Sequence, residues 1–287
     1  MNLTELNTVM DVTRRGFIGL AAMGAVVLTT KPSAAGPKAE LWDRWTQRAP
    51  SSSLKVDNTL WQKFLDARLK NNPAGLNTVD YAGVTAEERK YVDDYVALLS
   101  RTEVSKLNPA EQKAYWINFY NALTIQVILD HMPVKTIMDV DISSGLFAQG
   151  PWGKKLVMVE GEELSLDDME HRILRPIWSD PRIHYGVNCA SVGCPDLIMN
   201  PYDPETMDAT LTANAIAYVN SPRGVRMEGG DVIASKIYDW FVEDFGGNEA
   251  GILAHLRQYA QGDLKVALES ATKISDYEYD WALNAAL

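Results

Sequence analysis

Apolar and polar residues follow one another along most of this 287-residue chain in patterns that predict more helix than strand. Apolar residues spaced three and four apart are typical of amphipathic helices. Thr85 and Glu88 form a capping box before a helix to about residue 100, and Asn108-Pro109 begins a long helix to about residue 130. Further helices are predicted over residues 61–69, 166–174, 203–219, 236–245 and 249–260.

Short extended segments lie between these helices. Strands are predicted over residues 156–159, 163–164, 182–188, 223–228 and 231–234. Glu160-Gly161 and Gly229-Gly230 supply turns for two hairpins, and Pro176 predicts that the helix before it ends at Leu174. Because the strands neither alternate regularly with helices nor form one run, the pattern predicts a mostly helical α+β domain with a small, largely antiparallel sheet.

The first 35 residues have the composition of an export signal. Arg14-Arg15 precede an apolar run over residues 17–30, and the small residues 33–35 offer a signal-peptidase site after Ala35. As a helix this run would rise only ~21 Å, short of the ~30 Å hydrocarbon core, so no stable membrane anchor is expected after cleavage. The paired arginines resemble a twin-arginine signal, with a general secretory signal as the alternative. We therefore expect a periplasmic or otherwise exported bacterial protein.

Cleavage would leave about 250 residues, enough for one large domain or two small ones. We expect a loosely held lead-in over residues 36–54, apart from an anchor at Leu41–Trp45, and a single domain over 55–287. The whole chain carries a net charge of −11, and loss of the three basic and two acidic leader residues makes it −12. Such a chain repels phosphate backbones, so nucleic acid is not an expected partner.

Both cysteines lie in the short segment 184–195, where the predicted strand ends at Cys189 and a Gly193-Cys194-Pro195 turn follows. Such a strand end is a common place for reactive side chains. One hypothesis makes Cys189 a nucleophile whose thiolate a histidine or backbone amides stabilise. The alternatives are a Cys189–Cys194 disulfide, which the spacing and an exported location permit, and two inert buried thiols. The spacing is a weak zinc pattern, so no metal is predicted.

The helix predicted over residues 166–174 carries two further candidates for catalysis. Glu170 falls inside its apolar stripe, where a carboxylate needs a partner, whereas Asp168 and Arg175 are expected to face water. Glu170 would be an acid, a base or the orienter of an imidazole, or else part of a core ion pair. His171 lies at the edge of the stripe, from which its imidazolium could stabilise the Cys189 thiolate.

Several polar residues are candidates for binding. Strand alternation would point His184 away from Cys189, as a hydrogen-bonded structural histidine. Asn118 and Asn121 share one face of the long helix, where their amides either hydrogen-bond a loop or line a pocket as donors to an oxyanion. The candidate binding residues are Asn118, Asn121, Asn188, Ser191 and His184.

Four segments, at residues 113–123, 166–175, 182–195 and 279–284, resemble in the same order the family catalogued as domain of unknown function 547. The resemblance extends from about residue 105 to the C-terminus. It implies no established activity and no cofactor. In some plant members a similar domain is joined to a glutaredoxin-like domain, an association that points to thiol chemistry. In the last segment, Asp280-Trp281 and Asn284 predict a tether for the C-terminus.

These observations favour an exported thiol-dependent hydrolase or transferase that acts on an amide or thioester bond of a small-molecule or peptide substrate. Cys189 would be the nucleophile, with Glu170 and His171 beside it. The alternative is a non-catalytic periplasmic binding module shaped by a Cys189–Cys194 disulfide. A thiol–disulfide redox protein is the third possibility, although the chain lacks a Cys-x-x-Cys motif.

Overall fold

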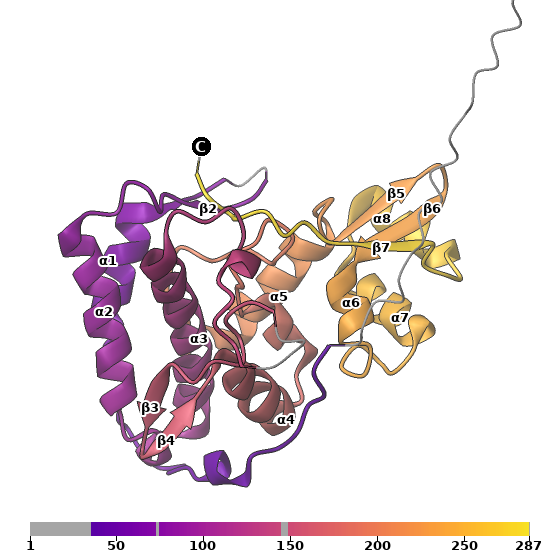
Figure 1. Cartoon of the computed structure of the whole chain (residues 1–287). Helices are drawn as coiled ribbons and strands as arrows, with labels where there is room; N and C mark the ends of the chain where they lie inside the picture. Colours follow the sequence, from indigo (N-terminus) through magenta and orange to yellow (C-terminus); the bar gives the residue numbers. More distant parts are fainter. Residues whose placement is uncertain (1–35, 73–74, 145–148, 287) are drawn as a thin grey trace, which may run out of the picture. The chain divides into compact units, whose positions relative to one another are not determined.

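The structure, a computed structural model, describes residues 36–72, 75–144 and 149–286, which belong to one compact unit (Figure 1). The predicted leader lies outside these residues. The described chain folds as a single α+β domain that is mostly helical and has small, mostly antiparallel sheets. Within the described stretches, no helix has both the length and the apolar character needed to cross a bilayer.

Helices make up most of the regular structure. The α-helices are α1 (Thr59–Arg68), α2 (Ala86–Arg101), α3 (Pro109–His131), α4 (Arg175–Trp178), α5 (Met207–Val219), α6 (Lys236–Trp240), α7 (Glu249–Tyr259) and α8 (Gly262–Ser270). A π-helical segment, η4 (Asp168–Leu174), leads directly into α4. The 3-10 helices are η1 (Asp43–Thr46), η2 (Val104–Lys106), η3 (Ile137–Asp139) and η5 (Pro181–Tyr185). The sequence pattern did not predict α8.

The strands form three small sheets. Their bounds are β1 (Leu69–Lys70), β2 (Thr78–Val79), β3 (Val157–Val159), β4 (Glu162–Leu164), β5 (Val225–Glu228), β6 (Asp231–Ser235) and β7 (Asp276–Glu278). The predicted β3–β4 and β5–β6 hairpins are confirmed, and β1 pairs with β2 in the same antiparallel sense. An unpredicted strand, β7, pairs in parallel with β6, so the largest sheet has the order β5-β6-β7.

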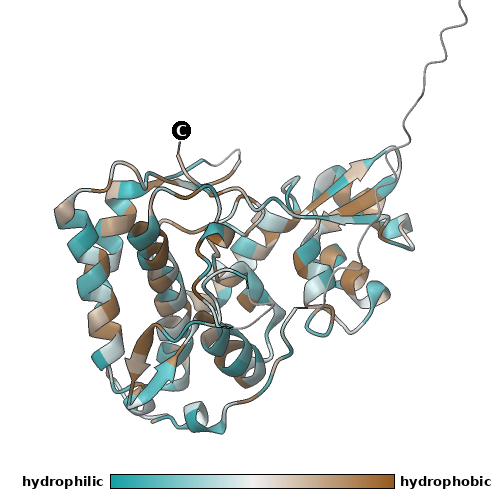
Figure 2. Ribbon diagram, in the orientation of Figure 1, coloured by the Kyte–Doolittle hydropathy of each residue, from teal (hydrophilic) through white to brown (hydrophobic). Residues whose placement is uncertain are grey.

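Helix α3 forms the centre of the larger hydrophobic core. The Asn108 side chain accepts from the backbone N–H groups of Ala110 and Glu111, which confirms the predicted cap. Most side chains between residues 111 and 128 are buried, since α2 and η4 pack against α3. Helices α1 and α2, which pack on each other, carry both polar and apolar positions (Figure 2), as expected of helices with one buried side.

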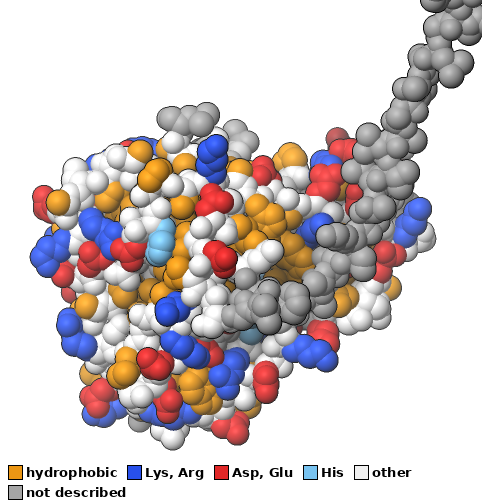
Figure 3. Space-filling model, in the orientation of Figure 1, with side chains coloured by type: hydrophobic (Ala, Val, Ile, Leu, Met, Phe, Trp, Pro, Cys, Tyr) orange, Lys and Arg blue, Asp and Glu red, His pale blue; other side chains and the backbone are white. Residues whose placement is uncertain are grey.

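A smaller hydrophobic core lies among β5, β6 and the helices α5 to α8. Tyr218, Tyr238 and Phe245 are its large buried side chains, and Ile237 and Tyr185 belong to it as well. On the face shown in Figure 3, acidic and basic side chains are scattered and apolar side chains gather towards the middle.

The segment before the cysteines differs from the prediction. Residues 182–188 are not a strand, because Pro181 to Tyr185 form the 3-10 helix η5. Pro181 occupies its first turn, and the Asp180 carboxylate caps it by accepting from the Arg182 N–H. A 3-10 helix has about three residues per turn, so strand alternation does not govern where His184 points.

Pro176 does not end the helix that precedes it. In η4 the Arg175 N–H bonds to the Glu170 carbonyl, a five-residue step that defines the π-helix. The carbonyl of His171 is left for the Glu40 N–H at 2.9 Å, and that of Arg172 accepts from the Trp42 N–H at 3.0 Å.

The Arg172 carbonyl is the one that residue 176 of an ordinary α-helix would bond, and proline has no N–H to offer it. The lead-in satisfies both carbonyls and is fixed along η4. Trp42 does so within the predicted anchor, whereas Glu40 lies in the part that was predicted to be loosely held.

The C-terminal segment runs from β7 back to β2 (Figure 1). Asn284 is fully buried there, and its side chain accepts from the Tyr81 hydroxyl at 2.8 Å and donates to Asn188 Oδ1 at 3.4 Å. Its backbone N–H donates to the Ala190 carbonyl, and its carbonyl accepts from the Val79 N–H. The predicted tether is thus present, and it ends against the cysteine loop.

Candidate functional site

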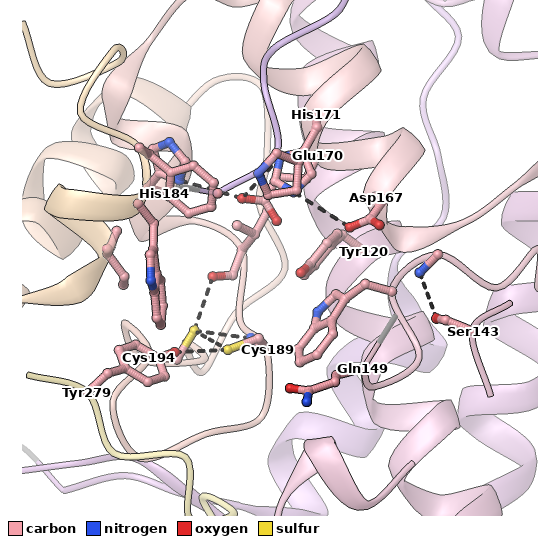
Figure 4. A pocket seen from close by; sticks show the side chains of 18 of the residues that line it. Tyr120, Ser143, Gln149, Asp167, Glu170, His171, His184, Cys189, Cys194 and Tyr279 are labelled. Carbon is pink, nitrogen blue, oxygen red and sulfur yellow. Dashed lines mark hydrogen bonds and ion pairs between the residues drawn. The ribbon is translucent and has the colours of Figure 1, made fainter. Parts of the chain in front are cut away.

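A cavity of about 520 Å³ lies where the two cores meet, and it holds the candidate catalytic residues Cys189, His171 and Glu170 together with His184 (Figure 4). Aromatic side chains make up much of its wall: Tyr120, Trp152, Trp240, Phe241, Tyr279 and Trp281. The site therefore combines a thiol, ionisable groups and a mainly apolar wall, as small-molecule sites commonly do.

Cys189 lies on the cavity wall among three hydrogen-bonding side chains. Its Sγ is 3.2 Å from Cys194 Sγ, 3.2 Å from Ser191 Oγ and 3.1 Å from the Tyr279 hydroxyl. The hydrogen bond with Cys194, followed by those with Ser191 and Tyr279, outweighs burial and lowers the pKa of Cys189 to about 7. A substantial fraction of this thiol is therefore thiolate at neutral pH.

Asn188 fixes the backbone that carries this thiol. Its side chain accepts from the Ala190 N–H at 2.9 Å and donates to the Pro195 carbonyl at 2.7 Å, so it spans the cysteine loop. Ala190 has a φ of 59°, a left-handed conformation that non-glycine residues seldom adopt. The Cys189 N–H donates to Cys194 Sγ at 3.1 Å, which keeps the two sulfurs adjacent.

The two cysteines differ in environment although both are free thiols. Cys194 is 4% exposed, and burial, reinforced by Cys189, raises its pKa well above the usual value. Cys189 is the more accessible of the two and is the one whose pKa is lowered. Cys194 therefore stays protonated and is available as a donor when Cys189 ionises.

Glu170 lies on the opposite side of the cavity and is 7% exposed. Its Oε1 is 3.5 Å from His184 Nδ1 and 4.0 Å from His171 Nδ1. Burial alone would raise the pKa of Glu170, but the two histidines and Arg175 outweigh it and lower that pKa to about 2. The carboxylate therefore stays ionised at neutral pH, where His184 and Arg175 are its cationic neighbours.

His184 supplies the positive charge beside Glu170. Its Nε2 is 2.6 Å from Asp244 Oδ2, and its ring stacks on Phe241 with the centroids 4.4 Å apart. Burial opposes protonation, but Asp244 and Glu170 together raise the pKa of His184. His184 thus lines the cavity on the side away from Cys189, and both of its ring nitrogens face carboxylates.

His171 is the neutral histidine of the pair. Burial lowers the pKa of His171 to about 4, with Arg175 and His184 acting in the same direction against Glu170. Arg175 Nη1 donates to His171 Nδ1 at 3.0 Å, which leaves the proton on Nε2, 3.6 Å from Asp167 Oδ1. Asp167 also lines the cavity, and burial, followed by Glu170 and Asp168, raises its pKa to about 6.

Two residues predicted to face water are buried instead. Arg175 is 5% exposed, and its Nε donates to Asp244 Oδ2 at 2.6 Å. Asp168 is 4% exposed and accepts from Ser165, Lys155 and Arg172. The prediction assumed an α-helix, which turns by about 100° per residue. A π-helix turns by a smaller angle per residue, so both side chains lie on a different side of the helix from the one predicted.

The histidines and the thiol lie on different sides of the cavity (Figure 4). Among the described residues, neither His171 nor His184 is within hydrogen-bond distance of Cys189 Sγ. The expectation that a His171 imidazolium stabilises the thiolate is therefore wrong, since His171 is neutral and the thiol's partners are a second thiol and two hydroxyls. A substrate would have to bridge the two sides.

The candidate binding asparagines hold loops in place. Asn118 exchanges two hydrogen bonds with the backbone of Tyr202, at 2.8 and 2.9 Å. Asn121 donates to the Gly186 carbonyl and accepts from the Asn188 N–H, so it fixes the backbone just before Cys189. Neither helix asparagine is among the residues that line the cavity, so the structure favours their loop-holding interpretation.

Sequence reasoning missed several residues of the site. Tyr279 is the first residue of the terminal motif, and its place in that motif was the only sequence feature that could have identified it as a site residue. Asp244 carried no such signal. Gly36 also lines the cavity, and a side chain there would collide with Phe241, because a Cβ would lie 2.6 Å from that ring.

Within the described part of the chain, no group of three or more His, Cys, Asp or Glu side chains is arranged to hold a metal ion. The ionisable side chains are instead paired with one another, with Arg175 and with hydroxyl groups.

Residues 104–219 match the model of a family described as "Protein of unknown function, DUF547". This segment contains three of the four motifs named above and both cysteines, whereas the terminal motif lies beyond it. No curated protein and no solved structure matches the chain.

Proposed function

We propose that this chain is an exported thiol-dependent hydrolase or transferase that acts on amide or thioester bonds, with Cys189 as the nucleophile. One observation carries the proposal. Cys189 Sγ lies on the wall of a cavity large enough for a small molecule, within 3.2 Å of Cys194 Sγ and the hydroxyls of Ser191 and Tyr279. These groups stabilise a thiolate that faces the space a substrate would occupy.

Asp167 is our candidate for proton transfer. It lies across the cavity from the thiol, and its pKa of about 6 is close to the range in which a carboxyl group exchanges protons efficiently at neutral pH. The Nε2 of the neutral His171 lies 3.6 Å from Asp167 Oδ1, just beyond hydrogen-bond distance. Glu170 holds His184 in place and stays ionised, so we assign it a positioning role.

In the proposed reaction, the Cys189 thiolate attacks the substrate carbonyl carbon and forms a C–S bond. The C–N bond of an amide then breaks as Asp167, which with a pKa of about 6 is protonated in about one tenth of the molecules at pH 7, gives its proton to the leaving nitrogen. Water, deprotonated by the Asp167 carboxylate, attacks the thioester, which releases the carboxylic acid and restores the thiolate and the protonated Asp167. The Tyr279 hydroxyl, next to Cys189 Sγ, is our candidate donor to the oxyanion.

A second candidate function is thiol–disulfide exchange, which the short Cys189–Cys194 distance favours. An accessible thiol of low pKa beside a buried thiol of high pKa is the arrangement that an attacking and a resolving cysteine require. The two functions make different demands on Cys194, because only the redox reaction needs its sulfur.

Acylation of the protein by p-nitrophenyl acetate tests the proposal. We expect a burst of p-nitrophenolate and an acetyl group on Cys189, found by peptide mass spectrometry, in the wild type and in Cys194→Ser. Cys189→Ala should give neither. If Cys189 is not acylated in the reduced protein, the nucleophile proposal fails, and a binding module shaped by the cysteine loop becomes the better interpretation. Activity that requires Cys194 would favour the redox function.

A further inference from the structure

The side of the cavity away from the thiol has an unbalanced negative charge. Five ionisable groups meet there at neutral pH: Asp167, Glu170, Asp244, His184 and Arg175. His184 and Arg175 both contact Asp244, and His184 also contacts Glu170. The three carboxylates therefore exceed the two cations by one charge.

The excess is located at Asp167. Its only ion-pair partner among the described residues is the imidazole of His171, at 3.6 Å, and that imidazole is neutral at pH 7. The Asp167 side chain is 39% exposed, and it lines the cavity. Lys155 acts on Asp167 only from a distance, because its ion pair is with Asp168. An anionic group that faces a cavity without a cation in contact attracts a cationic ligand more strongly than the same group in bulk water.

The wall beside Asp167 is aromatic. The Asp167 N–H donates to the Trp152 carbonyl at 3.0 Å, which places the two residues next to each other on the wall. Trp152 packs against Trp281 with ring centroids 5.8 Å apart, and Trp281 packs in turn against Trp240 at 5.5 Å. Aromatic faces attract alkylammonium groups through their quadrupoles and accept the attached carbon chain.

We propose that this side of the cavity is a subsite for an aliphatic ammonium group, so that the substrate is an amide of an aliphatic amine, or a thioester whose acyl group passes to such an amine. The subsite consists of Asp167 and Glu170 with the aromatic wall of Trp152, Trp240 and Trp281. The assignment of this subsite rests on the proposed function. In that reaction the nitrogen of the leaving amine, or of the amine that receives the acyl group, lies opposite Cys189.

The chemistry at the two ends of the cavity agrees with this assignment. The carbonyl carbon must reach Cys189, and the nitrogen must reach a group that can give or take a proton. Asp167 would protonate a departing nitrogen, and the amine, once it has gained a second proton from water, would remain as an ammonium ion beside two carboxylates. In the transfer direction the bound ammonium ion would first lose one proton to water, and Asp167 would accept the second proton as the neutral amine attacks the thioester and the Cys189 thiolate leaves.

Binding of matched probes to the purified Cys189→Ser variant tests the subsite without the reaction. The probes are n-butylamine, n-butanol and n-butyrate, which are similar in size and differ in charge. Tryptophan fluorescence is the readout, because three tryptophans line the cavity. We expect n-butylamine to bind at least tenfold more tightly than n-butanol and n-butyrate to bind most weakly.

Asp167→Asn in the same background should reduce the preference for the amine to less than threefold. Asp167 is the variant of choice because it is partly exposed and has no strong partner to lose. Asp263→Asn, on exposed α8, should keep the full preference. Equal binding of amine and alcohol, tighter binding of butyrate, or a preference that survives Asp167→Asn would overturn the subsite.

These results are independent of whether Cys189 reacts. An amine preference together with an unreactive Cys189 would leave the subsite in place and refute the proposed hydrolase. Acylation of Cys189 without an amine preference would keep the hydrolase and refute the ammonium subsite.

Discussion

Replacing Cys194 by alanine should raise the pKa of Cys189, whereas replacing it by serine should leave that pKa low. The Cys194 thiol lies 3.2 Å from Cys189 Sγ, and this hydrogen bond contributes most to the low pKa of Cys189. Serine keeps a donor of similar size at that place, and alanine removes it. The pair of variants therefore separates the effect of the donor from the effect of losing a sulfur.

The expected size of the effect follows from the strength of one such bond. A hydrogen bond to a charged group contributes about 1.5–3 kcal/mol, and one pKa unit corresponds to about 1.4 kcal/mol. Ser191 and Tyr279 stay in place, so we expect a rise of about one unit, from about 7 to about 8. The thiolate fraction at pH 7 would then fall from about one half to about one tenth.

The assay is the rate of iodoacetamide labelling at Cys189 as a function of pH, followed by mass spectrometry of the peptide. The midpoint of the rate profile reports the pKa. His171→Ala serves as a second control and should leave the midpoint unchanged, because that imidazole is neutral and does not bond the thiol. Equal midpoints for Cys194→Ala and Cys194→Ser, or a midpoint that moves only with His171→Ala, would refute the reasoning.

Other variants test the supports of the site. Glu170→Ala should cost about 2–4 kcal/mol of unfolding free energy, because it leaves the buried His184 with one carboxylate fewer. The pKa of Glu170 is near 2 in the folded protein and ~4.3 when unfolded, so its contribution is full above about pH 5. The stability advantage of the wild type over Glu170→Gln, measured by urea unfolding, should therefore shrink as the pH falls from about 5 towards 2, and a constant difference would contradict this. Asn121→Ala and Asn118→Ala should each cost about 1–3 kcal/mol by leaving backbone groups unpaired, but only Asn121→Ala should slow the labelling of Cys189, whose backbone it holds. Replacing Arg14 and Arg15 by lysine should leave an uncleaved precursor in the cytoplasm if the leader is a twin-arginine signal, and N-terminal sequencing of the exported wild type should begin at Gly36.

The parts of the fold that the sequence predicts well are those set by local chemistry. The caps at Thr85 and Asn108 and the turn at Glu160-Gly161 are present as expected, because side chains and backbone within a few residues determine them. Strand β7 and its parallel pairing with β6 depend on residues more than 40 positions apart, which no local pattern records.

The errors at the site have the same origin. The segment 182–188 has the composition of a strand, but the proline and the Asp180 cap before it favour a 3-10 helix. The sequence also did not show that η4 is a π-helix, so the buried side of this helix was predicted wrongly. The carbonyls freed by its π-helical turn and by Pro176 accept from the backbone N–H groups of residues 40 and 42, which are far away in the sequence. Local propensity is a weak guide where a distant segment supplies the hydrogen bonds.

Cys189 itself could be singled out from the sequence, but its environment could not. Ser191 and Cys194 are close in sequence, whereas Tyr279 lies 88 residues beyond Ser191 and reaches the same sulfur. The sequence therefore located the thiol, and only the fold shows that hydroxyl and thiol donors surround it in place of an imidazole.

The arrangement of the cavity indicates which part of the chain must act as a unit. The matched segment 104–219 contains Cys189 and Glu170, yet the donor Tyr279 and the ion-pair partner Asp244 both lie beyond it. The lead-in before it supplies Gly36 to the wall and backbone donors to the helix that carries Glu170. A fragment limited to the matched segment would expose η4 carbonyls and leave His184 without Asp244, so its buried charges would lack their partners. Both flanking segments are therefore as necessary to the site as the motif that carries the thiol.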